Sequence, residues 1–66
     1  MKEAEEVAKA FHDTYERLAP EHNYDTRPTS AKPWEEVPGN NKNLMIAVVD
    51  ELFDSGVIAR GPARLF

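Results

Sequence analysis

The chain has 66 residues, no cysteine and a net charge of −4. A chain of this length forms one small domain near the lower size limit for independent folding, and without cysteine it has neither disulfides nor thiolate metal ligands to stabilise it. An acidic chain without clustered Lys and Arg is also not typical of a protein that binds polymeric nucleic acid.

No segment is typical of a signal peptide or of a membrane span. The sequence begins with charged residues, and no run of about 18 apolar residues follows anywhere. We therefore expect a soluble protein of the cytoplasm, or of the host cytoplasm if a phage encodes it, with no membrane partner.

Residues 3–19 are predicted to form an amphipathic helix. Acidic residues occupy its first turn, where they suit the positive end of the helix dipole, and Pro20 ends it. Apolar side chains recur every three or four positions and form one stripe, which consists of Ala4, Val7, Ala8, Phe11, Tyr15 and Leu18.

Residues 20–39 form a long connector that holds every proline except Pro62. Tyr24 and Trp34 indicate that the connector is ordered, because large aromatic side chains are costly to leave in water. The segment 33–38 predicts one helical or 3₁₀ turn between two prolines, with Trp34 and Val37 on one side.

Residues 40–55 are predicted to form a second helix, with Asn40 or Asn41 as its N-cap and Gly56 in the left-handed conformation after its end. Its apolar side chains spread over an arc of roughly 200°, whereas contact with one partner needs a stripe of about 100°. The excess predicts that this helix contacts two neighbours.

We assign one part of this arc to the first helix and the rest to a second subunit. The part facing the first helix consists of Leu44, Val48 and Leu52. The predicted oligomer interface consists of Ile46, Val49 and Phe53. The predicted fold is therefore all-α: an antiparallel two-helix hairpin with a long structured proline-rich connector, which forms a homo-oligomer through its second helix and ends in a weakly specified tail, 56–66.

The sequence offers little for catalysis. His12 lies on the shoulder of the apolar stripe, where it is either a half-buried side chain bonded to a loop carbonyl or a ligand contact; no nucleophile stands at a recognisable spacing from it. Adjacent carboxylates such as Glu35 and Glu36 diverge by about 100° on a helix. We expect no catalytic residue, no metal site and no cofactor.

Aromatic and basic residues that flank the connector are more informative. Tyr15, Tyr24 and Trp34 offer flat surfaces, and Arg27, Lys32 and Lys42 offer positive charge. A ring stacked on an aromatic side chain, with a cation at its phosphate, is a common way to hold a small nucleotide. The alternative is that Tyr24 and Trp34 only cover the hairpin core.

Four motifs follow one another along residues 11–53: His12-x-x-Tyr15, Asn23-Tyr24, Pro33-Trp34-Glu35-Glu36-Val37-Pro38 and Lys42-x-Leu44-x-x-Ala47-Val48-Val49. This pattern resembles one RyR repeat, the small module named for ryanodine receptors that also occurs in bacterial and phage proteins. The family's Gly-Trp in the middle segment is replaced by His22-Asn23, and Tyr15 replaces a tryptophan. The resemblance implies a nucleotide-derived ligand, no catalysis, and candidate ligand contacts at His12, Tyr15, Tyr24, Arg27, Trp34 and Lys42.

Two functions follow as expectations. The first is a non-enzymatic module that binds a small anionic ligand and sequesters a nucleotide or ADP-ribose-derived signal molecule. The alternative is a protein–protein interaction module that docks through its apolar second helix and has no small ligand.

Overall fold

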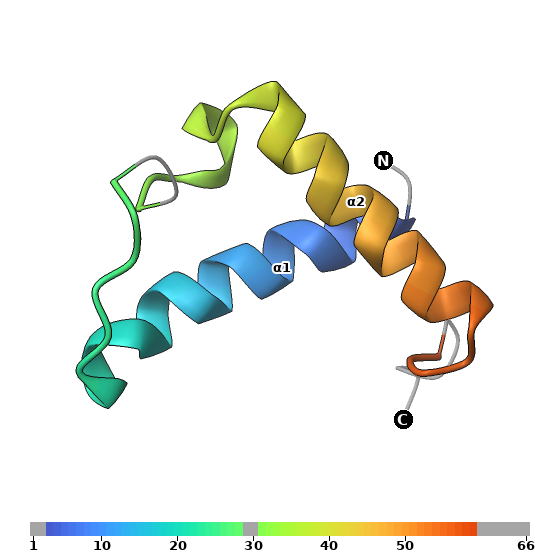
Figure 1. Ribbon diagram of the computed structural model, residues 1–66, viewed down its shortest axis with the longest axis horizontal. Coiled ribbons are helices and arrows are strands. Elements are labelled where there is room, and N and C mark those ends of the chain that lie inside the picture. The colour runs from blue at the N-terminus through green and yellow to red at the C-terminus, as the bar shows by residue number, and fades with distance from the viewer. Residues whose placement is uncertain (1–2, 29–30, 60–66) are drawn as a thin grey trace.

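The computed structural model describes residues 3–28 and 31–59, and this part of the chain is all-helical, without a strand (Figure 1). The elements are α1 (Glu3–Leu18), the 3₁₀ turns η1 (Ala19–His22) and η2 (Trp34–Glu36), and α2 (Gly39–Asp54). The predicted all-helical class is confirmed. Helix α1 begins at the predicted residue and ends one residue earlier, and both bounds of α2 lie one residue earlier than predicted.

The end of α1 is set by Pro20, which forces the chain into η1. After this turn Asn23 adopts the left-handed conformation, with φ 57°. The backbone N–H of Tyr24 then donates to the carbonyl of Ala19 over 2.9 Å. This reversal returns the chain towards α1 and places Tyr24 beside it.

The short turn η2 has the predicted form. The N–H of Glu36 donates to the carbonyl of Pro33 over 2.8 Å, and that of Val37 donates to the carbonyl of Trp34 over 3.1 Å. Trp34 and Val37 are buried, whereas Glu35 and Glu36 are exposed. The turn therefore sorts its side chains between core and solvent.

Helix α2 begins at Gly39, with Pro38 as its N-cap and no capping side chain. The predicted N-caps Asn40 and Asn41 are wrong, because both residues lie inside the helix. The reason is that Pro38 already has the extended geometry of a cap, and its carbonyl accepts the N–H of Lys42 over 3.0 Å.

The end of α2 agrees with the prediction. Gly56 has φ 81°, and the N–H groups of Val57 and Ile58 donate to the carbonyl of Leu52 over 3.0 and 3.3 Å. Ile58 then folds back and packs against the core. This is the usual role of a glycine after a helix.

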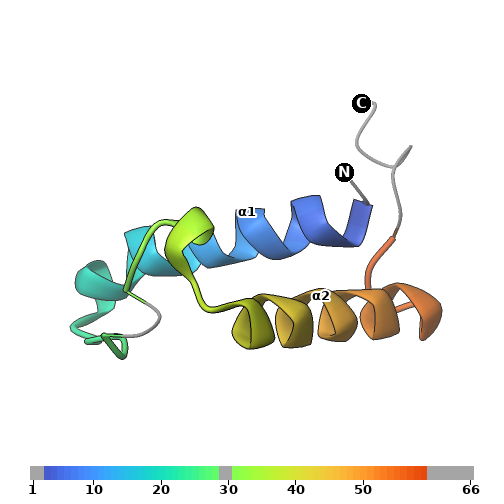
Figure 2. The ribbon, with the colours of Figure 1, turned by 90° about the horizontal axis from the view of Figure 1, so that it is seen from above.

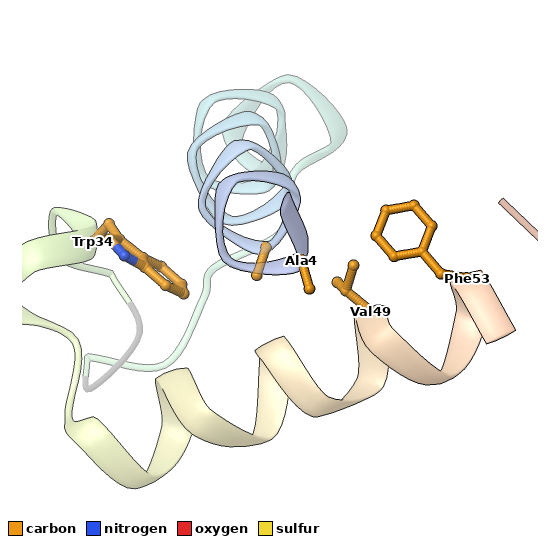
Figure 3. Close-up of a cluster of buried hydrophobic side chains, with 5 residues drawn as sticks. Ala4, Trp34, Val49 and Phe53 are labelled. Carbon is orange, nitrogen blue, oxygen red and sulfur yellow. The ribbon is translucent and has the colours of Figure 1, made fainter. Parts of the chain in front are cut away.

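The core lies where the first turns of α1 cross the second half of α2 (Figures 1 and 2). Figure 3 shows Ala4 pointing towards Val49, with Trp34 and Phe53 approaching α1 from two sides. Small alanine side chains allow the two backbones to approach closely, and the larger residues fill the space beside them.

The predicted division of faces on α2 is wrong. Val49 and Phe53 are buried in the core of the chain itself and Ile46 is packed against it, so these residues are not the surface left over for a second subunit. Leu44 and Val48, expected to face α1, are 64% and 48% exposed. The width of an apolar arc shows how much surface a helix can bury, but it does not show which part of that arc faces α1.

The buried stripe of α1 also differs from the predicted one. Ala4 and Ala8 are buried as expected, but His12 continues this line, and Phe11 and Tyr15 are 62% and 44% exposed. The two large rings are displaced because η2 inserts Trp34 beside α1, next to His12. No helix in the described ranges is long and apolar enough to cross a membrane.

Candidate functional site

An open hollow of about 310 Å³ lies between the C-terminal half of α1, the segment 24–27 and the first turns of α2. This volume is at the lower end of the range for small-molecule sites. We call it the hollow; its lining residues are Phe11, His12, Tyr15, Glu16, Tyr24, Thr26, Arg27, Asn41 and Met45.

Three rings form one wall of the hollow. Phe11 and Tyr15 lie one helical turn apart on α1 and stack, with ring centroids 5.9 Å apart and planes inclined by 29°. Tyr24 meets Tyr15 edge to face, with centroids 6.2 Å apart and an angle of 88°. Because all three rings are partly exposed, this wall can take a further flat group.

The segment that carries Arg27 is tied to α1 by a side-chain hydrogen bond. The hydroxyl of Thr26 donates to Oε1 of Glu16 over 2.7 Å. The carbonyl of Arg27 accepts the N–H of Ala31 over 2.8 Å. These two bonds hold the backbone on both sides of the Arg27 side chain.

Arg27 is an available cation. Within ranges 3–28 and 31–59 the ion pair found joins Lys9 to Asp13 over 2.7 Å, and it lies outside the hollow. The exposed Arg27 guanidinium therefore has no carboxylate partner in that part of the chain, although the carboxylate of Glu16 lines the same hollow. An anion and a hydrogen-bond donor on one ligand would match this pair of charges.

His12 forms part of the floor of the hollow. It is only 5% exposed, and its Nε2 lies 2.7 Å from the carbonyl oxygen of Lys32. A carbonyl only accepts, so Nε2 carries a proton and donates it to this oxygen. Of the two interpretations open for His12, the bond to a loop carbonyl is therefore present, and the ring also lines the hollow.

Trp34 and Lys42 do not line the hollow. Trp34 is 5% exposed and belongs to the core, where its ring lies 5.8 Å from that of His12. Lys42 places its Nζ 5.5 Å from the centroid of the Trp34 ring and donates to the carbonyl of Glu35 over 3.4 Å. Of the two interpretations given for Trp34, a ligand contact or a cover of the hairpin core, its position agrees with the second.

The structure thus brings together four of the six predicted ligand contacts, namely His12, Tyr15, Tyr24 and Arg27. It adds five residues that the sequence analysis did not propose: Phe11, Glu16, Thr26, Asn41 and Met45. Asn41 and Met45 lie four residues apart on α2, and this spacing is the one sequence feature that could have placed both on the same side of the helix. The bond between Thr26 and Glu16 joins two elements, and no sequence pattern indicates it.

The pKa of Tyr15 is raised above its ordinary value of 10.0. Removal of water from the hydroxyl is the largest cause, followed by the neighbouring hydroxyl of Tyr24 and then by the negative charges of Tyr24 and Glu16. The phenol of Tyr15, which is protonated at neutral pH even at its ordinary pKa, is thus moved further from ionisation.

The described part of the chain contains no group of three His, Asp or Glu side chains placed to hold a metal ion. The hollow offers rings, one cation, one carboxylate and several hydrogen-bonding groups. Comparison with known protein families, with curated proteins and with solved structures finds no match to this chain.

Proposed function

We propose that the protein is a non-enzymatic module that binds a small, flat, anionic ligand in the hollow. The observation that carries this proposal is the convergence of the Tyr15 and Tyr24 rings with an Arg27 side chain that has no carboxylate partner among the described residues. The ring of the ligand would lie against the tyrosines and its anionic group would bind Arg27.

The chemistry of the hollow favours a nucleotide or an ADP-ribose derivative. Stacking of a base on an aromatic side chain contributes about 1–3 kcal/mol, and arginine binds phosphate through two parallel hydrogen bonds. The Glu16 carboxylate would accept from a sugar hydroxyl or a ring amine. A volume of about 310 Å³ suits one base with its sugar and phosphate better than a polymer.

The wider setting is part of the same proposal. We take the fold as an antiparallel hairpin whose proline-rich connector supplies Tyr24 and Arg27. The resemblance to a single RyR repeat of the phage type supports a nucleotide-derived ligand. A module that binds such a molecule without transforming it would sequester a signal in the cytoplasm, and homo-oligomers would present several hollows.

Calorimetric titration with adenosine monophosphate, ADP-ribose and a cyclic dinucleotide tests the proposal. We expect binding by at least one of these probes, and we expect Arg27→Ala to weaken it about tenfold or more because a charge-assisted bond is lost. Arg17→Ala is the matched control, since Arg17 is exposed on α1 and does not line the hollow.

Titrations that show no heat with any of the three probes would contradict the proposal. Equal weakening by Arg17→Ala and Arg27→Ala would also contradict it, because the effect would then come from net charge.

One observation favours the second function, a protein–protein interaction module without a small ligand. Leu44 and Val48 remain exposed on α2, and neither side chain lines the hollow. This second function would be supported if the chain bound none of the probes and if substitution of Leu44 or Val48 abolished binding to a protein partner.

A further inference from the structure

We infer that a second copy of this chain covers the outer face of α2, and that the two α2 helices pack antiparallel about a two-fold axis at Val48. We define the outer face as Leu44, Val48 and Glu51, with the half-buried Met45 and Leu52 along its edge. This inference names the partner and the surface, and it does not depend on whether the hollow binds a ligand.

The apolar side chains of this face lie together. Leu44 and Val48 are one helical turn apart and are 64% and 48% exposed. Met45, beside Leu44, lines the hollow together with Phe11, which is 62% exposed. Met45 therefore marks the boundary between the outer face of α2 and the hollow.

The exposed area fits a small, reversible dimer. A large apolar or aromatic side chain has on the order of 150–200 Å² of surface. Leu44 and Val48, at 64% and 48% exposure, therefore leave about 200 Å² of apolar surface open on each copy. A standard interface buries about 800 Å² per partner, of which somewhat more than half is apolar. We therefore expect a dimer that dissociates on dilution.

The charges of α2 favour an antiparallel pair. Its first turn contains no acidic residue and has no capping side chain, so the N-terminal end is positive. Its second half carries Asp50, Glu51 and Asp54. Antiparallel packing places this acidic second half beside the first half of the other helix, which has no acidic residue, whereas parallel packing would bring the acidic halves together. A face that is complementary to itself points to a second copy as its occupant.

The core of a single copy is small, which gives the dimer a role in stability. The buried apolar residues of the described ranges are Ala4, Ala8, Ala19, Trp34, Val37, Val49 and Phe53, and no large side chain there is below 2% exposed. Domains of this size commonly need a partner, a metal or disulfides for stability. Burial of Leu44 and Val48 between two copies would supply apolar contacts that one copy lacks.

Cross-linking tests the antiparallel geometry directly, because the chain has no natural cysteine. An axis at Val48 places the two copies of that residue face to face, so Val48→Cys should form a covalent dimer under mild oxidation. The two copies of Leu44 would be about 12 Å apart along the helices. Because a disulfide needs Cα atoms within about 7 Å, Leu44→Cys should cross-link at least tenfold more slowly. Equal rates at both positions would overturn the antiparallel arrangement.

Sedimentation of the full chain tests the surface itself. We expect a mass that rises from monomer to dimer over roughly 1–300 μM, and we expect Val48→Glu to remain monomeric throughout this range. Val57→Glu is the matched control, because Val57 is 69% exposed and lies beyond α2; it should dimerise like the unmodified chain. Helical circular dichroism shows whether each variant is folded.

Two results would overturn the inference: an unmodified chain that is monomeric at all concentrations, or a folded Val48→Glu variant that dimerises normally. Neither result bears on the hollow, since Val48 does not line it. Conversely, absence of ligand binding in a chain that dimerises through Val48 would contradict only the proposed function.

Discussion

At the scale of single residues, His12 shows how one side chain serves both core and hollow. Its Nε2 proton is used by the carbonyl of Lys32, its ring packs beside Trp34, and its remaining edge reaches the hollow. A histidine held in this way fixes the distance between α1 and the connector. Its first role is therefore structural, and it shapes the hollow by holding the floor in place.

His12→Ala should lower the free energy of unfolding by about 1–3 kcal/mol, because it removes a mostly buried ring and its hydrogen bond. His22→Ala is the matched control; His22 is exposed in η1, and its loss should change stability by less than about 0.5 kcal/mol. Urea unfolding of both variants at one protein concentration measures the difference. Equal stability of the two variants would contradict the role given to the bond with Lys32.

At the scale of elements, the ends of α2 depend on backbone conformation more than on side-chain contacts. An added Cβ would find open space at both Gly39 and Gly56, but only Gly56 has a positive φ, of 81°. Both positions therefore have room for a methyl group, but only at Gly56 would an alanine be strained.

Gly56→Ala should lower the free energy of unfolding by about 1 kcal/mol, because alanine is strained at a positive φ. Gly39→Ala should have no effect or raise it by up to about 1 kcal/mol, since alanine favours the helix and restricts the unfolded chain. Thermal unfolding at one protein concentration checks both. A stabilised Gly56→Ala variant would contradict the account of how α2 ends.

Local patterns in the sequence were enough to predict these elements. Pro20, the prolines around Trp34 and Gly56 act on the backbone within a few residues, so the end of α1, the turn η2 and the end of α2 were predicted correctly. The turn η1 was not predicted. The N-cap of α2 was predicted wrongly, because Pro38 supplied the cap geometry ahead of two more typical asparagines. N-cap propensity ranks the candidate residues, but the backbone conformation of the residue that precedes the helix determines which of them is the N-cap.

At the scale of the whole molecule, the packing of α1 against α2 could not be read from the sequence. Both helices carry more apolar residues than one contact uses. The alanines of α1 are buried in the core, whereas Phe11 and Tyr15 stay partly exposed, because Trp34 fills the space beside the alanines. In this packing Leu44 and Val48 lie on the exposed side of α2. Phe11 and Tyr15 lie outside the core and line the hollow.

The candidate site was predicted only in part. His12, Tyr15, Tyr24 and Arg27 converge because α1 and the segment after η1 lie next to each other along the chain. Trp34 and Lys42 are brought together with each other instead, on the core side of η2. The aromatic and basic residues near the connector therefore form two separate groups, one in the hollow and one at Trp34. The sequence does not show which residue belongs to which group.

We propose that the hollow, and not the Trp34 region, binds the ligand. Mapping amide chemical shifts while adding the tightest probe from the calorimetric panel tests it most directly. We predict saturable shifts at Tyr15, Tyr24, Arg27 and Asn41, with the Trp34 indole and Lys42 signals nearly unchanged. Saturable shifts centred on Trp34 and Lys42, with none at Tyr24 and Arg27, would contradict the account.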